Sequence, residues 1–324
     1  MPKLPPRITE RLRLPIIAAP MLRISGPDLV VAACNAGVIG AFPTANARDG
    51  AQQLDDWMTE MQERTDATAA PICPNLIIRQ TRRDEHVELL VRHRFDLVIT
   101  SVGSPAPVID DLHAVGTLVL ADVATLEHAN KAVDAGADGL ILLTAGAGGQ
   151  TGWLNPFAFV SAVRSFFDGP IVLAGGIGDG RSLLAAATLG CDLAYMGTKF
   201  IATTESMASD EYRDMLVGST LDDVRLTSAF TGLPTNMLLP AILAAGLDPN
   251  LLDEQVTPLE ADVMYGANSE TPGPKRWQHV FSAGHSVSGV RRTSSVSELV
   301  QATVREYEAA RQQTLDQWSE RQRA

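Results

Sequence analysis

The stretch PIVLAGGIGDGRSLLAAATLGCDLAYMGT, residues 170–198, contains one complete strand–helix–strand unit. It begins with the aliphatic run 170–176 and ends with a second run at 193–198. Both runs are apolar on their two faces, which is typical of strands in a parallel sheet covered on both sides. The segment between them has helical periodicity, follows Asp179, a good helix N-cap, and closes at Gly190, a residue that readily ends a helix. The stretch therefore predicts an α/β protein.

Six further runs of the same kind precede this unit. They are residues 15–20, 37–42, 71–78, 96–101, 117–123 and 139–144. Segments of helical periodicity alternate with them, for example 27–36, 126–136 and 156–167. Eight strands with helices between them, over about 200 residues, fit a (β/α)8 TIM barrel better than an open sheet. A doubly wound open sheet is the alternative, because a strand count from sequence is easily wrong by one.

Residues 205–275 interrupt this alternation. The segment reads as mostly helix and loop, with little strand signal. Because it follows the eighth predicted strand, we expect a helical cover over the C-terminal mouth of the barrel, where the active sites of this fold lie. Residues 1–204 and 276–324 would form the barrel itself, closed by an amphipathic helix at 295–318.

The composition is that of a globular, enzyme-sized chain. Apolar residues make up 45% and charged residues 20%, and no apolar run is long enough to cross a bilayer. The N-terminus lacks the apolar core of a secretory signal, so we expect a cytoplasmic protein. The net charge of −12 argues against nucleic acid or an anionic membrane as the main partner.

The cysteines and histidines do not indicate a metal site. Cys34, Cys73 and Cys191 lie far apart and form no CxxC pair, so we expect buried thiols. His86 and His93 are seven residues apart and fit one helix face, but no third ligand stands at a recognisable metal spacing. We therefore expect no metal.

Two glycine clusters stand at the C-terminal ends of the last two predicted strands. The first contains Gly175 and Gly176, and the second contains Gly197 and Thr198. Barrels often bind a phosphate between the loops after strands 7 and 8, where free backbone N–H groups supply hydrogen-bond donors. Tight turns would explain any one of these glycines alone, but two clusters at the two expected places predict a phosphate site.

The chain has no dinucleotide-binding fingerprint. In GAGGQTG, Gly146 and Gly148 form the first two positions of a Rossmann motif, but the third glycine, Gly152, comes one residue late. No acidic residue follows at the expected distance, and the chain lacks the G-K-[ST] of a P-loop.

Several motifs together resemble the nitronate monooxygenase family, formerly called 2-nitropropane dioxygenase. They are APM at 19–21, PNLI with Asn75, AGAGGQTG after the sixth strand, LAGGIGDGR, MGTKF, FTGLPTNML and FSAGHSVSG. The resemblance covers essentially the whole chain in the family's order and spacing. It implies a TIM barrel that holds one FMN and no metal.

The resemblance also implies which residues hold the cofactor. Backbone at Ala19, Pro20 and Met21 would face the flavin ring, and the amide of Asn75 its polar edge. Small residues suit this position, because a flat ring must lie close to the main chain. Some relatives have a lysine near the end of strand five, where this chain has Asp122. The full predicted set is Ala19, Pro20, Met21, Asn75, Asp122, Ala147, Gly148, Gly149, Gly175, Gly176, Gly197 and Thr198.

Gln150 departs from the family pattern. Many members have a histidine here, thought to act as base toward the nitroalkane α-carbon. An imidazole can take that proton near neutral pH and a carboxamide cannot, although Gln150 can still donate a hydrogen bond to a nitro oxygen. The departure weakens the case for neutral nitroalkanes as substrates and leaves preformed nitronates open. His285, flanked by small residues, is a candidate to restore a base; the alternative is a solvated loop histidine.

Three functions follow from these observations. The first is FMN-dependent oxidation of nitronates with O2, with Gln150 and His285 as candidate catalytic residues. The second is reduction of a quinone or an activated C=C bond by NAD(P)H through FMN, which needs no carbon-acid base. The third is a flavin-binding protein without turnover. Each takes a small-molecule ligand, and a homo-oligomer is possible.

Overall fold

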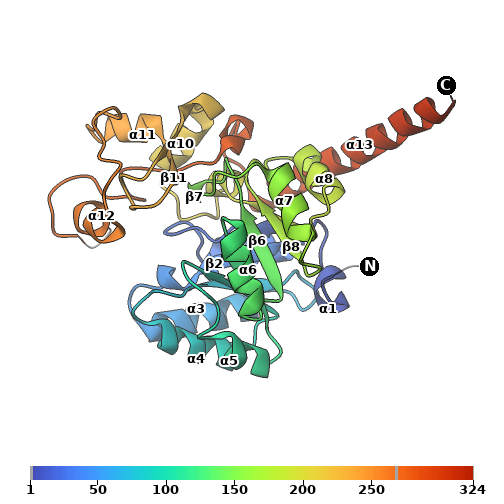
Figure 1. Cartoon of the computed structure of the whole chain (residues 1–324), viewed down its shortest axis with the longest axis horizontal. Helices are drawn as coiled ribbons and strands as arrows, with labels where there is room; N and C mark the ends of the chain where they lie inside the picture. The colour runs from blue at the N-terminus through green and yellow to red at the C-terminus, as the bar shows by residue number, and fades with distance from the viewer. Residues whose placement is uncertain (1–2, 267–268, 324) are drawn as a thin grey trace.

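The computed structural model describes residues 3–266 and 269–323, and its main body is a closed barrel of eight parallel strands (Figure 1). In barrel order the strands are β1 (Ile16–Ala18), β2 (Ile39–Pro43), β3 (Ile72–Ile77), β4 (Leu97–Ser101), β5 (Leu118–Val123), β6 (Gly139–Leu143), β8 (Ile171–Ala174) and β9 (Leu193–Met196). Each of the eight predicted runs forms one of these strands. Because β9 pairs in parallel with β1, the sheet closes, and the TIM-barrel prediction is confirmed over the open sheet.

Helices on the outside connect the strands. They are α2 (Pro27–Asn35), α3 (Ala51–Arg64), α4 (Arg83–His93), α5 (Ile109–Ala114), α6 (Leu126–Asp134), α7 (Pro156–Arg164), α8 (Gly180–Thr188) and the short α9 (Thr198–Ile201). The two predicted helix N-caps, Asn155 and Asp179, both cap helices in the structure. The Asn155 side chain accepts hydrogen bonds from the first turn of α7, and Asp179 forms a capping box with Ser182 at the start of α8.

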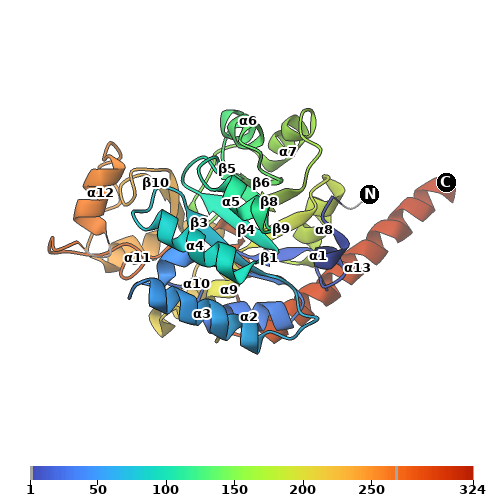
Figure 2. The ribbon, with the colours of Figure 1, turned by 90° about the horizontal axis from the view of Figure 1, so that it is seen from below.

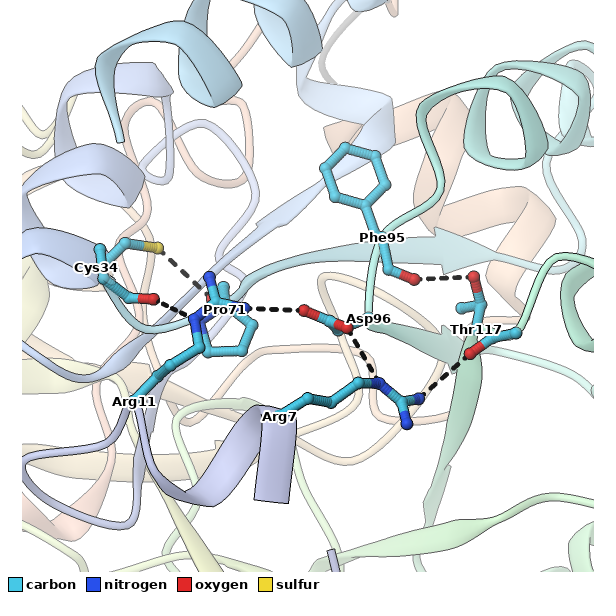
Figure 3. Close-up of polar contacts among 9 residues, drawn as sticks. Arg7, Arg11, Cys34, Pro71, Phe95, Asp96 and Thr117 are labelled. Atoms are coloured by element: carbon cyan, nitrogen blue, oxygen red, sulfur yellow. Dashed lines mark hydrogen bonds and ion pairs between the residues drawn. The ribbon is translucent and has the colours of Figure 1, made fainter. Parts of the chain in front are cut away.

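The N-terminal end of the barrel is closed by α1 (Pro6–Thr9) and its flanking residues. Leu4 and Ile8 are buried with the apolar side chains of the barrel interior. Arg7 Nε lies 3.1 Å from Asp96 Oδ1 and Arg11 Nη1 lies 2.9 Å from Asp96 Oδ2, so one carboxylate fixes both arginines (Figure 3). These contacts close the N-terminal end of the barrel.

The segment 205–275 has more strand than its sequence predicts. It contains α10 (Asp210–Gly218), η2 (Leu221–Asp223), α11 (Leu239–Ala244) and α12 (Pro258–Tyr265). It also contains β10 (Val224–Thr227) and β11 (Thr235–Leu238), which pair antiparallel, and β11 pairs with β7 (Gly149–Gln150) from the barrel. The segment is still mostly helix and loop, as predicted, but these two short strands are not predicted. A four-residue strand beside prolines and glycines is too short to show the alternation of apolar and polar residues that predicts a strand.

The strands β10 and β11 with α10, α11 and α12 lie together beside the barrel, at the end opposite the protruding C-terminus (Figure 1). We call residues 205–275 the cover. Pairing of β11 with β7 attaches the cover to the loop after β6. Residues 281–289, which end in η3 (His285–Gly289), also pack against this loop, since Gly284 N and Gly148 Cα are too close to leave room for a side chain at position 148.

The last helix, α13 (Val296–Arg323), confirms the predicted closing helix. Its first half packs on α8 and α2 and buries Val296, Val300 and Ala310. Beyond residue 310 it extends away from the barrel in both views (Figures 1 and 2). In the described part of the chain no helix is long and apolar enough to span a membrane.

Cys34, Cys73 and Cys191 are buried free thiols, as their spacing predicts.

Candidate active site

A cavity of about 660 Å³ lies at the C-terminal ends of the barrel strands, between the barrel and the cover. All the predicted cofactor residues line it, together with Gln150. The predicted set thus comes from the ends of β1, β3, β5, β6, β8 and β9 and converges on one site. Its volume is that of a pocket for a cofactor or drug-sized ligand.

The two glycine clusters lie side by side, because β8 and β9 are neighbours in the barrel. Gly175 (φ +128°) and Gly176 (φ +74°) adopt backbone conformations that disfavour a side chain. A Cβ on Gly175 would collide with the Thr144 hydroxyl, whereas one on Gly176 would meet no atom within 4 Å. Among the described residues, none accepts a hydrogen bond from the backbone N–H groups of Gly175, Gly176 or Gly197. The cavity therefore offers unused donors at this end.

The segment after β1 is held rigidly against β9. Ala19 N donates to Met196 O at 3.0 Å, and Ser25 Oγ accepts from Met21 N at 3.1 Å. Asn46 Nδ2 donates to Met21 O at 3.0 Å. Pro20 has no N–H group to satisfy. Residues 19–21 thus present a fixed stretch of backbone to the cavity.

Asn75 is oriented by its neighbour strand. The Ser101 hydroxyl on β4 donates to Asn75 Oδ1 at 3.0 Å, and Asn75 is only 5% exposed. With its oxygen occupied, the amide NH2 group of Asn75 is left to donate hydrogen bonds into the cavity.

Two buried polar atoms at the floor of the cavity have no partner among the described residues: Asp122 Oδ1 and Tyr195 Oη. Burial raises the pKa of Asp122 to about 7. Burial also raises the pKa of Tyr195, with further contributions from Asp122 and Cys73. Buried polar groups are rarely left without hydrogen bonds in proteins, so this pair is unusual; both oxygens have almost no accessible surface and lie beneath the cavity wall. Sequence reasoning missed Tyr195, although a tyrosine inside the aliphatic run LAYMGT was a usable signal.

Gln150 lies at the seam between barrel and cover. It belongs to β7 and is registered with Thr235 of β11. On the next residue of β11, Asn236 Nδ2 donates to Ala147 O at 2.7 Å. The Gln150 side chain is exposed at the cavity wall. The cover therefore determines the shape of the loop that carries Gln150.

His285 does not meet the expectation that it reaches the cavity. Its side chain is exposed, and the cavity is lined by the flanking residues Gly284 and Ser286 instead. His285 N donates to Gly146 O at 2.9 Å, and its ring packs against Gly146 on the outside of the loop. The small residues around it allow close packing of the backbone, and Gly284 N donates to Thr198 Oγ1 at 2.9 Å.

The ionisable side chains that line the cavity within the described ranges include no histidine, lysine or cysteine. Tyr212 Oη donates to Ser282 O at 2.5 Å, and burial raises its pKa to about 12. Asp262 forms an ion pair with Arg276 at 2.6 Å, at the outer rim. Asp122 is left as the acid whose pKa lies near neutrality.

The fold and the cavity define a TIM-barrel protein with its site at the C-terminal ends of the strands. The family model "Nitronate monooxygenase" matches residues 77–306. The chain belongs to the nitronate monooxygenase family and is an oxidoreductase of that family.

Individual relatives agree with this assignment. A nitronate monooxygenase of Paraburkholderia phytofirmans is 26% identical over 90% of this chain and 92% of its own length. A (3aS,4S,5R,7aS)-5-hydroxy-7a-methyl-1-oxo-octahydro-1H-indene-4-carboxyl-CoA dehydrogenase of Rhodococcus jostii is 29% identical over 69% of this chain. The matched stretch spans 62% of that dehydrogenase, which is less than two thirds of its length.

Solved structures share the fold. FabK from Thermotoga maritima has a TM-score of 0.78 with 24% identity, covering 96% of this chain and 98% of its own. A nitroalkane oxidase from Streptomyces ansochromogenes has a TM-score of 0.76 with 26% identity, covering 94% of this chain and 99% of its own.

Proposed function

We propose that this protein is an FMN-dependent oxidoreductase that oxidises nitronates with O2. Family membership and the similarity to a nitroalkane oxidase support this reaction class. Bound FMN would accept electrons from the substrate and pass them to O2. The residues that line the cavity would bind the cofactor and the substrate and orient them toward each other.

The residues present fit FMN. The free N–H groups of Gly175, Gly176 and Gly197 would hold the phosphate, as helix and loop donors do in other barrels. The rigid backbone of residues 19–21 would lie against the ring, and the oriented amide of Asn75 would donate to its polar edge. The unused N–H donors after β8 and β9 are the strongest support, because an anionic phosphate would accept hydrogen bonds from them.

On the substrate side, Gln150 would donate a hydrogen bond from its amide to a nitronate oxygen. It cannot remove a proton from carbon, and His285 is not among the residues that line the cavity. A nitronate has already lost that proton, so the site suits the anion better than the neutral nitroalkane. Among the described residues, the cavity lining contains the Gln150 carboxamide and no histidine, and this supports a nitronate as the substrate.

Anaerobic titration of the FMN-loaded protein tests the proposal. We expect ethylnitronate to bleach the flavin absorbance and O2 to restore it, with nitroethane reacting at least about 100-fold more slowly, the contribution of a general base. If the protein takes up FMN but no nitronate reduces it, the proposed reaction is wrong.

A second function is favoured by the same lining: reduction of a quinone or an activated C=C bond with NAD(P)H. Hydride transfer needs no base to remove a proton from carbon, so this reaction is compatible with a described cavity lining that contains no histidine. The name of the Rhodococcus relative, a dehydrogenase of a CoA thioester, supports redox chemistry on other carbon substrates within this family. Rapid bleaching by NADH or NADPH without any nitro compound would decide for this function.

A further inference from the structure

A second cavity, of about 560 Å³, adjoins the candidate active site. Four residues line both cavities: Leu22, Asp262, Arg276 and Trp277. The two cavities therefore lie on either side of these four residues. We call the second cavity the arginine cavity, because Arg23, Arg48 and Arg276 line it.

Arg23 is held in an unusual conformation beside this cavity. Its φ of +64° lies in the left-handed region, which non-glycine residues seldom adopt. Asn46 stabilises this backbone, since its Oδ1 accepts from Arg23 N at 2.8 Å while its Nδ2 donates to Met21 O and Ser25 O. Such conformations are concentrated at ligand sites, where the surrounding contacts over-determine them. The loop after β1 thus fixes an arginine at the cavity wall.

The charges around the cavity are not balanced by pairing. Arg276 has a carboxylate partner, Asp262. Among the described residues, neither Arg23 nor Arg48 has a carboxylate partner; the Arg23 guanidinium donates to the amide oxygen of Gln278, and Glu270 also lines the cavity. Burial and the charge of Arg48 both lower the pKa of Arg23, so the two guanidinium groups repel each other. In a chain of net charge −12, two adjacent arginines without carboxylate partners attract an anionic ligand.

We propose that the arginine cavity binds the phosphate groups of a nucleotide-type ligand whose reacting end reaches the candidate active site. Guanidinium groups match phosphate oxygens in a two-pronged geometry, and the volume exceeds what a single phosphate needs. A ribose phosphate beside a diphosphate occurs in coenzyme A and in NADPH, and either would supply this chemistry. The proposal rests on the proposed function only in placing the reacting end at the flavin.

Binding measured without turnover tests the proposal. Calorimetric titration of the FMN-loaded protein with coenzyme A, dephospho-coenzyme A, NADPH and NADH is expected to show tighter binding of the form that carries the ribose phosphate in at least one pair. The pair that shows the difference identifies the source of the nucleotide. Failure of all four to bind would overturn the proposal, whereas absence of flavin reduction by nitronates would bear only on the proposed reaction.

Arginine variants provide the matched comparison. Arg48→Gln and Arg23→Gln are each expected to weaken binding of the preferred nucleotide about 10- to 100-fold, the loss of charged hydrogen bonds to phosphate. Arg311→Gln, an exposed change on α13, should leave the affinity unchanged. Arg48 is exposed, so its variant should fold like the wild type, which the FMN absorbance spectrum checks. Unchanged affinity in both cavity variants would overturn the proposal.

Discussion

Asn236 Nδ2, on β11 of the cover, donates a hydrogen bond to the carbonyl oxygen of Ala147, in the loop after β6, at 2.7 Å. Asn236 is only 3% exposed, and Ala147 lines the candidate active site. Through this bond and the pairing of β7 with β11, the cover and the loop that carries Gln150 form one structural unit. The shape of the substrate side is therefore determined by residues almost 90 positions apart in the chain.

Asn236→Ala should destabilise the protein and weaken its hold on FMN. The substitution leaves the buried Ala147 carbonyl without its donor, which costs on the order of 1–3 kcal/mol in the free energy of unfolding. Urea unfolding and an FMN titration measure the two effects. Asn130→Ala, on the exposed face of α6, is the control and should stay within about 0.5 kcal/mol of the wild type. If Asn236→Ala binds FMN as tightly as the wild type, the contact between the cover and Ala147 does not contribute to cofactor binding.

Gly176→Ala should reduce FMN affinity through the phosphate end of the site. Gly176 has φ +74° and Gly190 has φ +99°, and a Cβ on either would meet no heavy atom within 4 Å. Each alanine variant should thus lose a similar stability, about 1–2 kcal/mol, from the left-handed backbone. Only position 176 faces the cavity, so only Gly176→Ala should weaken FMN binding. Equal FMN affinity in the two variants would contradict the assignment of the phosphate site.

Asp122 should give the protein a pH-dependent stability. An unfolded aspartate titrates near pH 4, as in model peptides, and burial raises the pKa of folded Asp122 to about 7. Between these values the folded state binds more protons, so this group's contribution is fully present below about pH 4 and is lost as the pH rises to about 7. Relative to Asp122→Asn, the wild type should lose at most about 4 kcal/mol across this window.

Urea unfolding of the wild type and Asp122→Asn between pH 4 and 8, at equal flavin content, measures this difference. Other carboxylates titrate in both proteins and cancel in the comparison. Parallel pH curves would mean that Asp122 ionises at its ordinary pH in the folded protein.

The barrel was predictable because each strand is a continuous aliphatic run, and parallel strands covered on both faces require that pattern. Gly176 and Gly197 could be placed together for a related reason, since the ends of consecutive parallel strands meet at one edge. Asn75 and residues 19–21 needed the family resemblance, because a single asparagine or proline has many structural uses.

The remainder of the site depends on contacts that sequence does not encode locally. For His285 the structure agrees with the solvated loop histidine, the alternative left open from sequence, and its ring packs against Gly146. The strands β10 and β11 are stabilised by pairing with each other and with β7 rather than by their own periodicity. Arg23 and Arg48 line one cavity with Arg276, which follows the cover in the chain, and no local sequence pattern places these three residues together.

Gln150→His should extend the activity to neutral nitroalkanes. The side chain at position 150 lies in the cavity wall, so an imidazole there would be placed to take a proton from a substrate carbon. We expect the rate of flavin reduction by nitroethane to rise about 100-fold or more, with the rate increasing as the pH passes about 6.5, where the imidazole becomes neutral. Reduction by ethylnitronate should change little, because that substrate needs no base. Stopped-flow bleaching of the flavin with both substrates measures the two rates, and Gln150→Asn controls for disturbance of the β7–β11 pairing. If the histidine variant gains no more with nitroethane than the asparagine variant, position 150 is not where the proton is removed.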